Sequence, residues 1–370
     1  MGFGGGTHAP VSTQAEFLSL ELVDCGPFRG PQVFSFARPP AGGRCGLTVV
    51  TGGGGKGKSS LISALRLALW GGPHLDAEHS RRYLGGLSPF VTDRRRYINA
   101  AALRSASPEA WLRLTLRVHA GDGAAKTLRI TRSLRAFADG SMTETSWLET
   151  AEAGEEPRQV DELYEECLAA LLTRDRMSPL FADSEQATTL AGLAAGDRRR
   201  REGAMREVIA LTGGRSLDPW RDASPAVIEL GNRLLACSSE AGEVRLLPEP
   251  AGPSCPEANL VVPGVCVSHE PSGATQLSCI GSALVVGLHS SDETQAPLVL
   301  DAPMNGMRPD QNVVFLEALS ELVHGQVVIA AHEEQIDDLA LSLWDRAQRI
   351  YLVERPKDAY TSLLSEPIAG

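Results

Sequence analysis

The chain has 370 residues, of which 43% are hydrophobic, so it is long enough for one large domain or two moderate domains with real cores. Its net charge of −11 excludes a protein that coats nucleic acid by overall positive charge, so any contact with DNA must come from local basic patches or from a partner. No apolar run reaches the length of a membrane span, and the N-terminus lacks a signal peptide pattern, which predicts a cytoplasmic protein without membrane contact. The 7 cysteines lack the spacing of a zinc site or of a disulfide framework.

The N-terminal part of the chain is predicted to form the first half of a nucleotide-binding fold. Residues 1–16 are rich in glycine without periodicity, which predicts disorder. Residues 17–110 follow as one unit, which opens with strands over 17–24 and 32–36. A short buried strand over 45–51 then leads into a glycine-rich turn.

The segment from Gly52 to Ser59 fits the phosphate-binding pattern G-x-x-x-x-G-K-[ST] at every fixed position. Helical spacing of apolar residues follows it, which gives the strand, loop and helix that the motif requires. We expect Lys58 to reach the β- and γ-phosphates of ATP and Ser59 to bind Mg²⁺. The residues predicted to hold the nucleotide here are Gly52, Gly54, Gly55, Lys56, Gly57, Lys58, Ser59 and Ser60.

The middle of the chain divides into three predicted parts. Residues 111–150 alternate with period two in three segments, which predicts an antiparallel β lobe. Residues 151–214 form a helical subdomain, with helices over 160–174 and 198–211. Residues 215–262 are rich in helix breakers, which predicts an irregular connector with one short helix, 226–236, that starts after Ser224 and Pro225.

The C-terminal unit, residues 263–370, alternates strands with helices, which predicts a mostly parallel sheet with helices on both faces. The predicted elements are helices over 276–288, 311–323 and 334–347 and strands over 296–301, 326–331 and 350–353. Asp301 ends an apolar strand, as the metal-holding acid of a Walker B motif does. His332 follows the next strand, where ABC-type ATPases carry a histidine that senses the γ-phosphate. The fold class predicted is therefore an α/β P-loop NTPase with an added antiparallel lobe.

The order of these motifs resembles the head domain of SMC-like and RecF-like ABC ATPases. Within that group the closest likeness is to the DndD family, the ATPases of bacterial DNA phosphorothioate modification. The closer likeness rests on three segments, 97–100, 180–186 and 301–304.

The resemblance implies a working cycle and further site residues. Two heads would close as a homodimer around two ATP molecules, each phosphate loop facing the partner's signature motif, and the cycle would act on DNA directly or through partner proteins. The nucleotide-binding and catalytic residues that it implies are Arg29, Asp183, Gln186 and His332, with a signature of Ser272, Gly273 and Gln276.

The chain departs from that family at several positions. Ala274 replaces the acid of the signature, and Arg308 stands where an aspartate is expected. Ala302 follows Asp301 where most ABC ATPases have the glutamate that acts as general base, so that base is left open among His332, Asp183 and Glu185. No heptads span 215–262, so the chain reads as a head without coiled-coil arms, either compact by nature or shortened.

Arginine clusters are the predicted DNA contacts, with a solvated helix face as the alternative for each. They comprise Arg94, Arg95 and Arg96 and then Arg198, Arg199 and Arg200. The function predicted is an ATP-hydrolysing head in DNA modification, phage defence or repair. The alternatives are an ATP-binding scaffold that does not hydrolyse ATP and, less in keeping with the motifs, a P-loop kinase or GTPase.

Overall fold

The computed structural model describes residues 14–40, 45–73, 94–119, 125–152, 158–159, 181–183, 187, 189–190, 218–237, 244–249, 260–269, 271, 273–290, 296–337, 346–355 and 363–364. The predicted helices 160–174 and 198–211 and most of the predicted disordered N-terminus lie outside these residues. None of the helices in the described part combines the length and apolar character that crossing a bilayer requires.

One of the two large sheets is antiparallel. In spatial order its strands are β2 (Pro31–Ser35), β1 (Gln14–Val23), β4 (Glu109–His119), β5 (Ala125–Ala136), β6 (Met142–Glu152) and β7 (Arg158–Gln159). The predicted lobe of three strands is therefore too small, because β1 and β2 belong to the same sheet. β1 pairs with β4 along its length, from Gln14 opposite His119 to Val23 opposite Trp111. The prediction of disorder is also wrong for residues 14–16, which begin β1.

The other large sheet is parallel except at one edge. Its strands, in spatial order, are β15 (Leu363–Leu364), β14 (Ala347–Glu354), β3 (Gly46–Thr51), β13 (Gln326–Ala330), β12 (Leu298–Asp301) and β8 (Phe181–Asp183). Only β15 pairs antiparallel among them. The strand predictions here are confirmed, but β14 begins at Ala347, where a helix was predicted to end.

Both faces of the parallel sheet are buried, and alternate residues belong to different cores. On β3, Leu47 and Val49 face one core and Val50 faces the other. Val327 and Val328 of β13 divide in the same way. A strand buried on both faces carries apolar residues at consecutive positions, which explains the near-continuous apolar runs of these strands.

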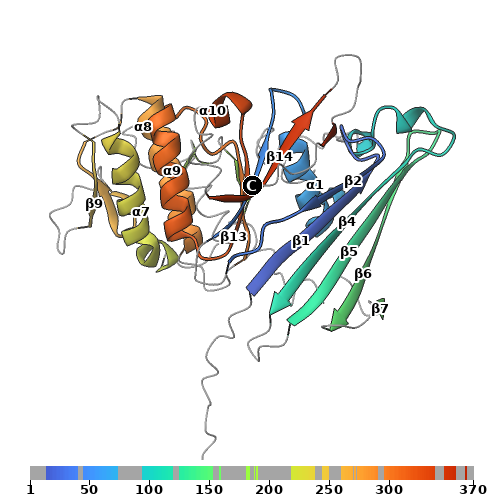
Figure 1. Ribbon diagram of the computed structural model, residues 1–370, viewed down its shortest axis with the longest axis horizontal. Helices are drawn as coiled ribbons and strands as arrows, with labels where there is room; N and C mark the ends of the chain where they lie inside the picture. The colour runs from blue at the N-terminus through green and yellow to red at the C-terminus, as the bar shows by residue number, and fades with distance from the viewer. Residues whose placement is uncertain are drawn as a thin grey trace, which may run out of the picture.

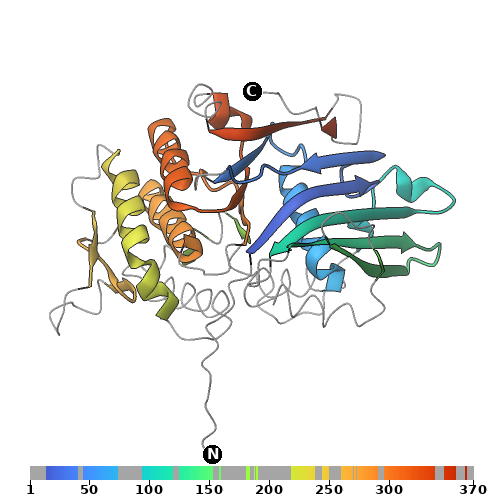
Figure 2. The ribbon, with the colours of Figure 1, turned by 60° about the horizontal axis from the view of Figure 1, so that its bottom comes forward.

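Helices cover the two faces in separate layers. They are α1 (Lys58–Trp70), α7 (Asp218–Ala236), α8 (Ala274–Ser290), α9 (Pro309–Leu322) and the short α10 (Glu333–Asp337). Figure 1 shows α7, α8 and α9 on one side of the parallel sheet and α1 between that sheet and the antiparallel sheet, and Figure 2 shows the same order from another side. The apolar side chains of α1 are buried in the core that the two sheets share.

The described part of residues 215–262 is not the irregular connector that was predicted. α7 begins eight residues before the predicted start at Ala226, and Pro225 lies inside it. Proline cannot donate to the carbonyl four residues back, and that carbonyl, on Arg221, accepts instead from the Ser224 hydroxyl at 2.8 Å. Short strands β9 (Leu246–Pro248), β10 (Leu260–Val262) and β11 (Val265–Val267) form a small sheet of their own.

Glycines permit close packing of α7 against α8 and against β9. A Cβ on Gly287 would lie 2.3 Å from Val227 Cγ2, and a Cβ on Gly231 would lie 2.3 Å from Leu246 Cδ1. Both distances are shorter than any carbon contact allows. The buried face of α7 can therefore approach its neighbours, which a count of helix breakers in this segment does not reveal.

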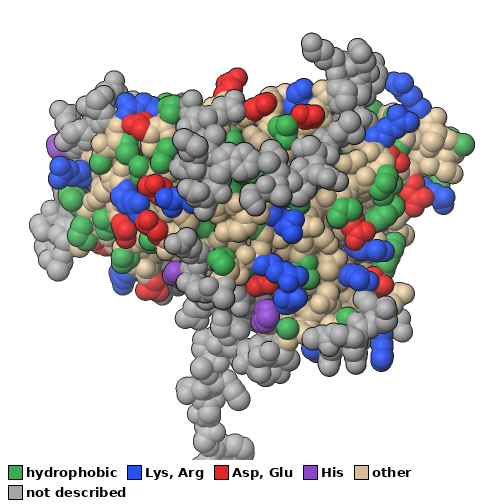
Figure 3. Space-filling view, in the orientation of Figure 1, with side chains coloured by type: hydrophobic (Ala, Val, Ile, Leu, Met, Phe, Trp, Pro, Cys, Tyr) green, Lys and Arg blue, Asp and Glu red, His purple; other side chains and the backbone are tan. Residues whose placement is uncertain are grey.

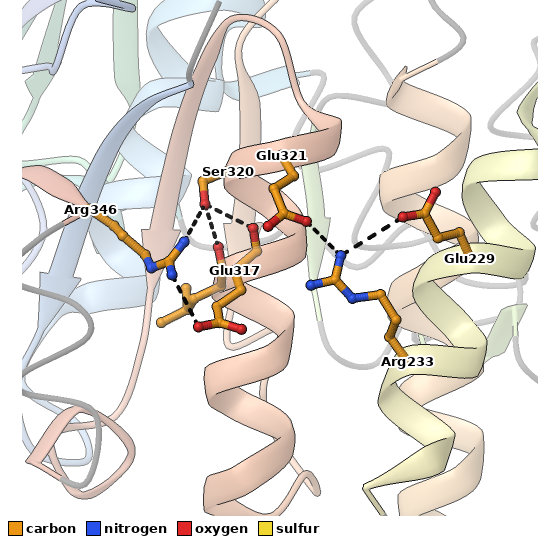
Figure 4. A network of polar contacts seen from close by, with 7 residues as sticks. Glu229, Arg233, Glu317, Ser320, Glu321 and Arg346 are labelled. Atoms are coloured by element: carbon orange, nitrogen blue, oxygen red, sulfur yellow. Dashed lines mark hydrogen bonds and ion pairs between the residues drawn. The ribbon is translucent and has the colours of Figure 1, made fainter.

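Polar contacts join the helical layer on its outer side, as Figure 4 shows. Arg233 of α7 donates to Glu321 of α9 at 2.6 Å. Arg346, just before β14, donates to Glu317 at 3.0 Å and to Ser320 at 3.3 Å. These half-exposed pairs fix α9 between α7 and β14 and contribute little free energy each.

A buried glutamine joins the two large sheets. Gln326, the first residue of β13, is 1% exposed. Its Oε1 accepts from the Phe17 amide at 2.7 Å, and its Nε2 donates to the carbonyls of Phe17 at 2.8 Å and Ala37 at 2.6 Å. The side chain thus replaces a peptide partner for β1, at a point where the antiparallel sheet meets the parallel one.

Candidate functional site

The glycine-rich loop between β3 and α1 has a backbone that only glycine adopts without strain. The φ angles are +150° at Gly52, +68° at Gly55 and +117° at Gly57, which is the residue before α1. A Cβ on Gly52 would lie 2.4 Å from the carbonyl oxygen of Val353, at the end of β14. Among the described residues, no neighbour lies within 4 Å of a Cβ on exposed Gly54. The loop therefore opens to solvent at the N-terminus of α1, where backbone N–H groups favour an anion.

Lys58 lies folded against this loop. Its side chain is 6% exposed, and its Nζ donates to the carbonyls of Gly52 at 2.7 Å and Gly53 at 2.9 Å. Burial lowers the pKa of Lys58, while the nearby carboxylates of Asp301 and Glu333 act in the opposite sense. Lys56 does not contact the loop carbonyls in this way and instead donates to the Arg355 carbonyl at 3.2 Å. Ser60 lies half-buried on the first turn of α1.

Asp301 and Ser59 are brought together from opposite parts of the chain. The Ser59 hydroxyl donates to Asp301 Oδ1 at 3.1 Å across 242 residues of sequence. Asp301 ends β12, which pairs with β13, and β13 in turn pairs with β3, the strand before the phosphate loop. A hydroxyl and a carboxylate oxygen at this distance are the ligand types that Mg²⁺ prefers, so the pair fits a magnesium ion bound with a phosphate.

β8 and α1 lie next to Asp301 at the edge of the parallel sheet. β8 is parallel to β12, with Asp183 in register with Asp301. Arg66 of α1 holds β8 in place, since its Nη2 donates to the Phe181 carbonyl at 3.4 Å and its guanidinium lies 5.3 Å from the centre of the Phe181 ring. Gln186 lies outside the described residues.

The segment after β13 runs beside the phosphate loop. The Ala331 amide donates to the Val50 carbonyl at 2.9 Å, and the Glu333 amide donates to the Gly52 carbonyl at 3.3 Å. His332 between them is half-buried, and its amide donates to Gln335 Oε1 at 3.0 Å. Gln335 also donates to the Met304 carbonyl at 3.1 Å, which ties this segment to the loop after β12.

The predicted signature lies at the start of α8. Gly273 precedes the helix, and its amide faces the side chain of buried Gln276 at 3.4 Å. Ser272 lies outside the described residues. Arg308, which stands where an aspartate was expected, directly precedes α9. Its guanidinium donates to the Cys237 carbonyl just after α7 and to Asp310 at 2.8 Å.

The other predicted residues that the structure describes lie on the side of the antiparallel sheet. Arg29 is exposed in the turn between β1 and β2. Arg94, Arg95 and Arg96 form a 3-10 turn, η1 (Arg94–Tyr97), and Arg96 is exposed. A cavity of about 1200 Å³ is lined by Arg96 together with Arg135, Phe137 and Arg355. Arg198, Arg199 and Arg200 lie outside the described residues.

Sequence reasoning did not identify Glu333 or Gln335 as site residues. Glu333 directly follows His332, and its amide bonds to the first glycine of the phosphate loop. The signal was present, since a residue next to a predicted site histidine on the same short turn must lie near that site. Gln335 is a helix-start glutamine whose role depends on long-range packing, which has no local signal.

Comparisons with known proteins agree with this architecture. A family model described as an AAA domain matches residues 19–152. No curated protein matches the chain. Among solved structures, the SMC head domain from Thermotoga maritima is 15% identical with a TM-score of 0.49, over 96% of this chain and 99% of that one.

Two further structures support a shared fold. An SMC head bound to the C-winged helix domain of ScpA is 14% identical with a TM-score of 0.51, over 95% of this chain and 97% of that one. An SMC head with an extended coiled coil, bound to the C-terminal domain of ScpA derived from Pyrococcus furiosus, is 13% identical with a TM-score of 0.53, over 96% and 97%. The chain therefore has the fold of an SMC head, a P-loop architecture with one antiparallel and one mainly parallel sheet.

Proposed function

We propose that this chain binds ATP at the loop between β3 and α1 and hydrolyses it to ADP and phosphate. The observation that carries the proposal is the hydrogen bond of 3.1 Å between Ser59 and Asp301. It joins the end of the phosphate loop to the acid at the tip of β12. A glycine-rich turn that matched the motif by chance would not be expected to lie beside such an acid. The fold of an SMC head supports the same activity.

Each residue of the loop has a role in this proposal. Lys58, now held by the carbonyls of Gly52 and Gly53, turns to the β- and γ-phosphates when ATP binds. The amides of the loop and the N-terminus of α1 bind the phosphate oxygens. Ser59 and Asp301 hold Mg²⁺, which when bound neutralises charge on the phosphates. In this proposal His332, which follows β13, senses the γ-phosphate, and Asp183 at the end of β8, Arg29 and Gln186 complete the nucleotide contacts.

The proposal extends to a cycle of two heads. ATP closes a homodimer in which Gly273 and Gln276, with Ser272, contact the nucleotide of the partner, and hydrolysis opens it. Partner proteins are part of this proposal, since the matching SMC heads are in complex with domains of ScpA. The process served is DNA modification of the DndD type, phage defence or DNA repair. A desulfurase and a sulfurtransferase encoded beside this chain would favour the first.

DNA contacts are proposed for the arginines of η1. Arg96 lines the cavity of about 1200 Å³ with two further arginines and the aromatic ring of Phe137, a combination that suits a nucleic acid strand. On the face in Figure 3, basic and acidic side chains alternate over the antiparallel sheet. Binding to DNA is therefore local, as the net charge of −11 requires. Arg198, Arg199 and Arg200 are proposed as a second contact.

ATP turnover by the wild type and by Lys58→Ala tests the enzymatic claim. We expect the variant to lose a factor of about 100 to 1000 in kcat, because the charge that stabilises the transferred phosphoryl group is removed. Lys126→Ala is the matched control, since Lys126 is exposed on β5. Equal background rates for wild type and Lys58→Ala would refute hydrolysis at this site.

A scaffold that binds ATP without hydrolysing it is the second candidate. Ala302 and Ala274 favour it, because both replace acids that the ABC ATPase pattern places at these positions. Tight binding of ATP without phosphate release, in the presence of DNA and partner proteins, is the result that would select it. Prompt phosphate release would exclude it.

A further inference from the structure

The position where a general base is expected is occupied by a residue with a constrained backbone. Ala302 has a φ of +52°, one of two non-glycine residues with positive φ in the described chain. Its amide donates to the Ala330 carbonyl at 2.8 Å, and its carbonyl accepts from the Asn305 amide at 3.0 Å. Both bonds hold the left-handed conformation, which larger side chains adopt at a cost. This chain therefore supplies no carboxylate from the residue after Asp301.

Glu333 brings a carboxylate to the same loop from another element. Its amide bonds to the Gly52 carbonyl at 3.3 Å, so its Cα lies beside the start of the phosphate loop. Its Oε2 lies 3.9 Å from the place where a Cβ on Gly53 would be. The side chain is exposed, so water reaches the carboxylate.

Glu333 also lies close enough to Lys58 to oppose the lowering of its pKa by burial. The ammonium of Lys58 interacts with two carboxylates, Asp301 from β12 and Glu333 from α10. Asp301 is engaged by the Ser59 hydroxyl. Glu333 has no role yet in the proposed mechanism, and it is exposed, so a water molecule can reach its carboxylate.

We propose that Glu333 is the general base of ATP hydrolysis in this chain, in place of a residue at position 302. This inference rests on the proposed function of the site. The water oxygen forms a bond to the γ-phosphorus while the bond from that phosphorus to the β–γ bridging oxygen breaks, and ADP leaves with that oxygen. Glu333 takes one proton from the water and later returns it to solvent, so that ATP and water give ADP, phosphate and a proton.

Two neighbouring groups, His332 and Glu334, are the alternatives beside the phosphate loop, while Glu185 lies outside the described residues. The backbone of His332 is held by Gln335, which accepts from its amide and donates its own amide to the His332 carbonyl at 3.0 Å. A histidine there suits contact with the γ-phosphate. Glu334, the next residue of α10, is also exposed, and no hydrogen bond or ion pair joins it to the phosphate loop among the described residues.

Three variants of the full chain test the proposal: Glu333→Gln, Glu333→Asp and Glu334→Gln. Steady-state ATP hydrolysis gives kcat and KM, and equilibrium binding of a fluorescent ATP analogue gives the dissociation constant. We expect Glu333→Gln to lower kcat by about 100-fold or more, because a positioned general base contributes that much. Its dissociation constant should stay within about threefold of the wild type or fall, since a negative charge beside the triphosphate is removed. Glu333→Asp should retain part of the activity, and Glu334→Gln should match the wild type.

The outcomes separate this inference from the proposed function. If the wild type hydrolyses ATP and Glu333→Gln keeps kcat within about threefold, Glu333 is not the base although the site is an ATPase. A fall in kcat shared equally by Glu334→Gln would show a general effect of α10 and would equally overturn the assignment. If the wild type binds ATP without turnover, the enzymatic proposal and this inference both fall. If it binds no ATP, the nucleotide site itself is refuted.

Discussion

The two ends of α1 show how one helix serves chemistry at one end and structure at the other. At its N-terminus, Lys58 donates to the loop carbonyls of Gly52 and Gly53, and the Ser59 hydroxyl donates to Asp301. At its C-terminus, Arg132 of β5 donates to the carbonyls of Ala68 at 2.9 Å and Leu69 at 3.2 Å. Both ends carry a buried cation, but the surroundings differ.

Arg132 has every partner that a buried cation needs. It also donates to Glu144 of β6 at 2.9 Å, and Glu144 accepts from the Gly72 amide at 3.0 Å. The side chains are 7% and 13% exposed. The last carbonyls of α1 favour a positive charge. The C-terminal end is thus a completed network between helix and sheet, whereas the N-terminal end holds a lysine that is available for an incoming anion.

Matched substitutions at the two ends should therefore differ most in stability. Arg132→Met should lower the free energy of unfolding by about 3–5 kcal/mol, because it leaves Glu144 and two helix carbonyls buried without a partner. Lys58→Met should leave stability equal or raised in the absence of nucleotide, because burial makes the ammonium unfavourable. Urea denaturation followed by circular dichroism measures both. Arg135→Met, three residues along β5 and exposed, should change stability by less than about 0.5 kcal/mol.

The pH dependence gives the sign of the Lys58 effect. The pKa of Lys58 is lowered in the folded chain from its ordinary value of 10.5. At a pH between the lowered pKa and 10.5, the folded chain therefore binds fewer protons than the unfolded chain. The unfavourable contribution is then fully present below the lowered pKa and is lost as pH rises to 10.5. The advantage of Lys58→Met should shrink over the same range. A variant less stable than the wild type at neutral pH would show that the lysine stabilises the empty loop.

The phosphate loop offers a second contrast, between two glycines two positions apart. Gly52→Ala should destabilise the chain by about 1–3 kcal/mol, since the new Cβ meets the Val353 carbonyl and φ is +150°. It should also abolish ATP binding, because the loop must move to relieve the clash. Gly54→Ala meets no neighbour within 4 Å and should leave stability nearly unchanged. Thermal unfolding and nucleotide binding of the pair measure this, and equal stability for both variants would mean that β14 yields to the new methyl group.

The parallel sheet and the phosphate loop could be predicted from the sequence because their signals are local. Strand β3, the loop and α1 follow one another in the chain, and Asp301 ends an apolar strand. The pairing of β1 with β4 is set by contacts between segments about 90 residues apart, so the size of the antiparallel sheet was not predictable from spacing. The start of α7 was missed for a local reason, since the Ser224 hydroxyl compensates for Pro225.

The site was only partly predictable for the same reason. The motif identifies Lys58 and Ser59 without knowledge of the fold, but the place of Glu333 depends on β13 pairing with β3, which carries the segment after β13 to the loop. The alternation of β5 puts Arg132 on the same face as the buried Leu128, Ile130 and Leu134, but it does not show what the arginine binds there. Its role at the end of α1 depends on how the sheet packs on the helix.

The smallest effect is expected at Ala302, the residue with positive φ that follows Asp301. Ala302→Gly should raise the free energy of unfolding by about 0.5–1 kcal/mol. The left-handed conformation costs alanine about 1–2 kcal/mol, which glycine avoids. Part of this gain is lost because glycine gives the unfolded chain more conformational entropy. The change leaves kcat unaltered if the base comes from Glu333, since the methyl group of Ala302 takes no part in proton transfer. Chemical denaturation and ATP hydrolysis on the same preparation measure both quantities. A loss of stability would indicate that the methyl group packs usefully, and a change in kcat would show that the conformation of this loop, as well as Glu333, controls the attacking water.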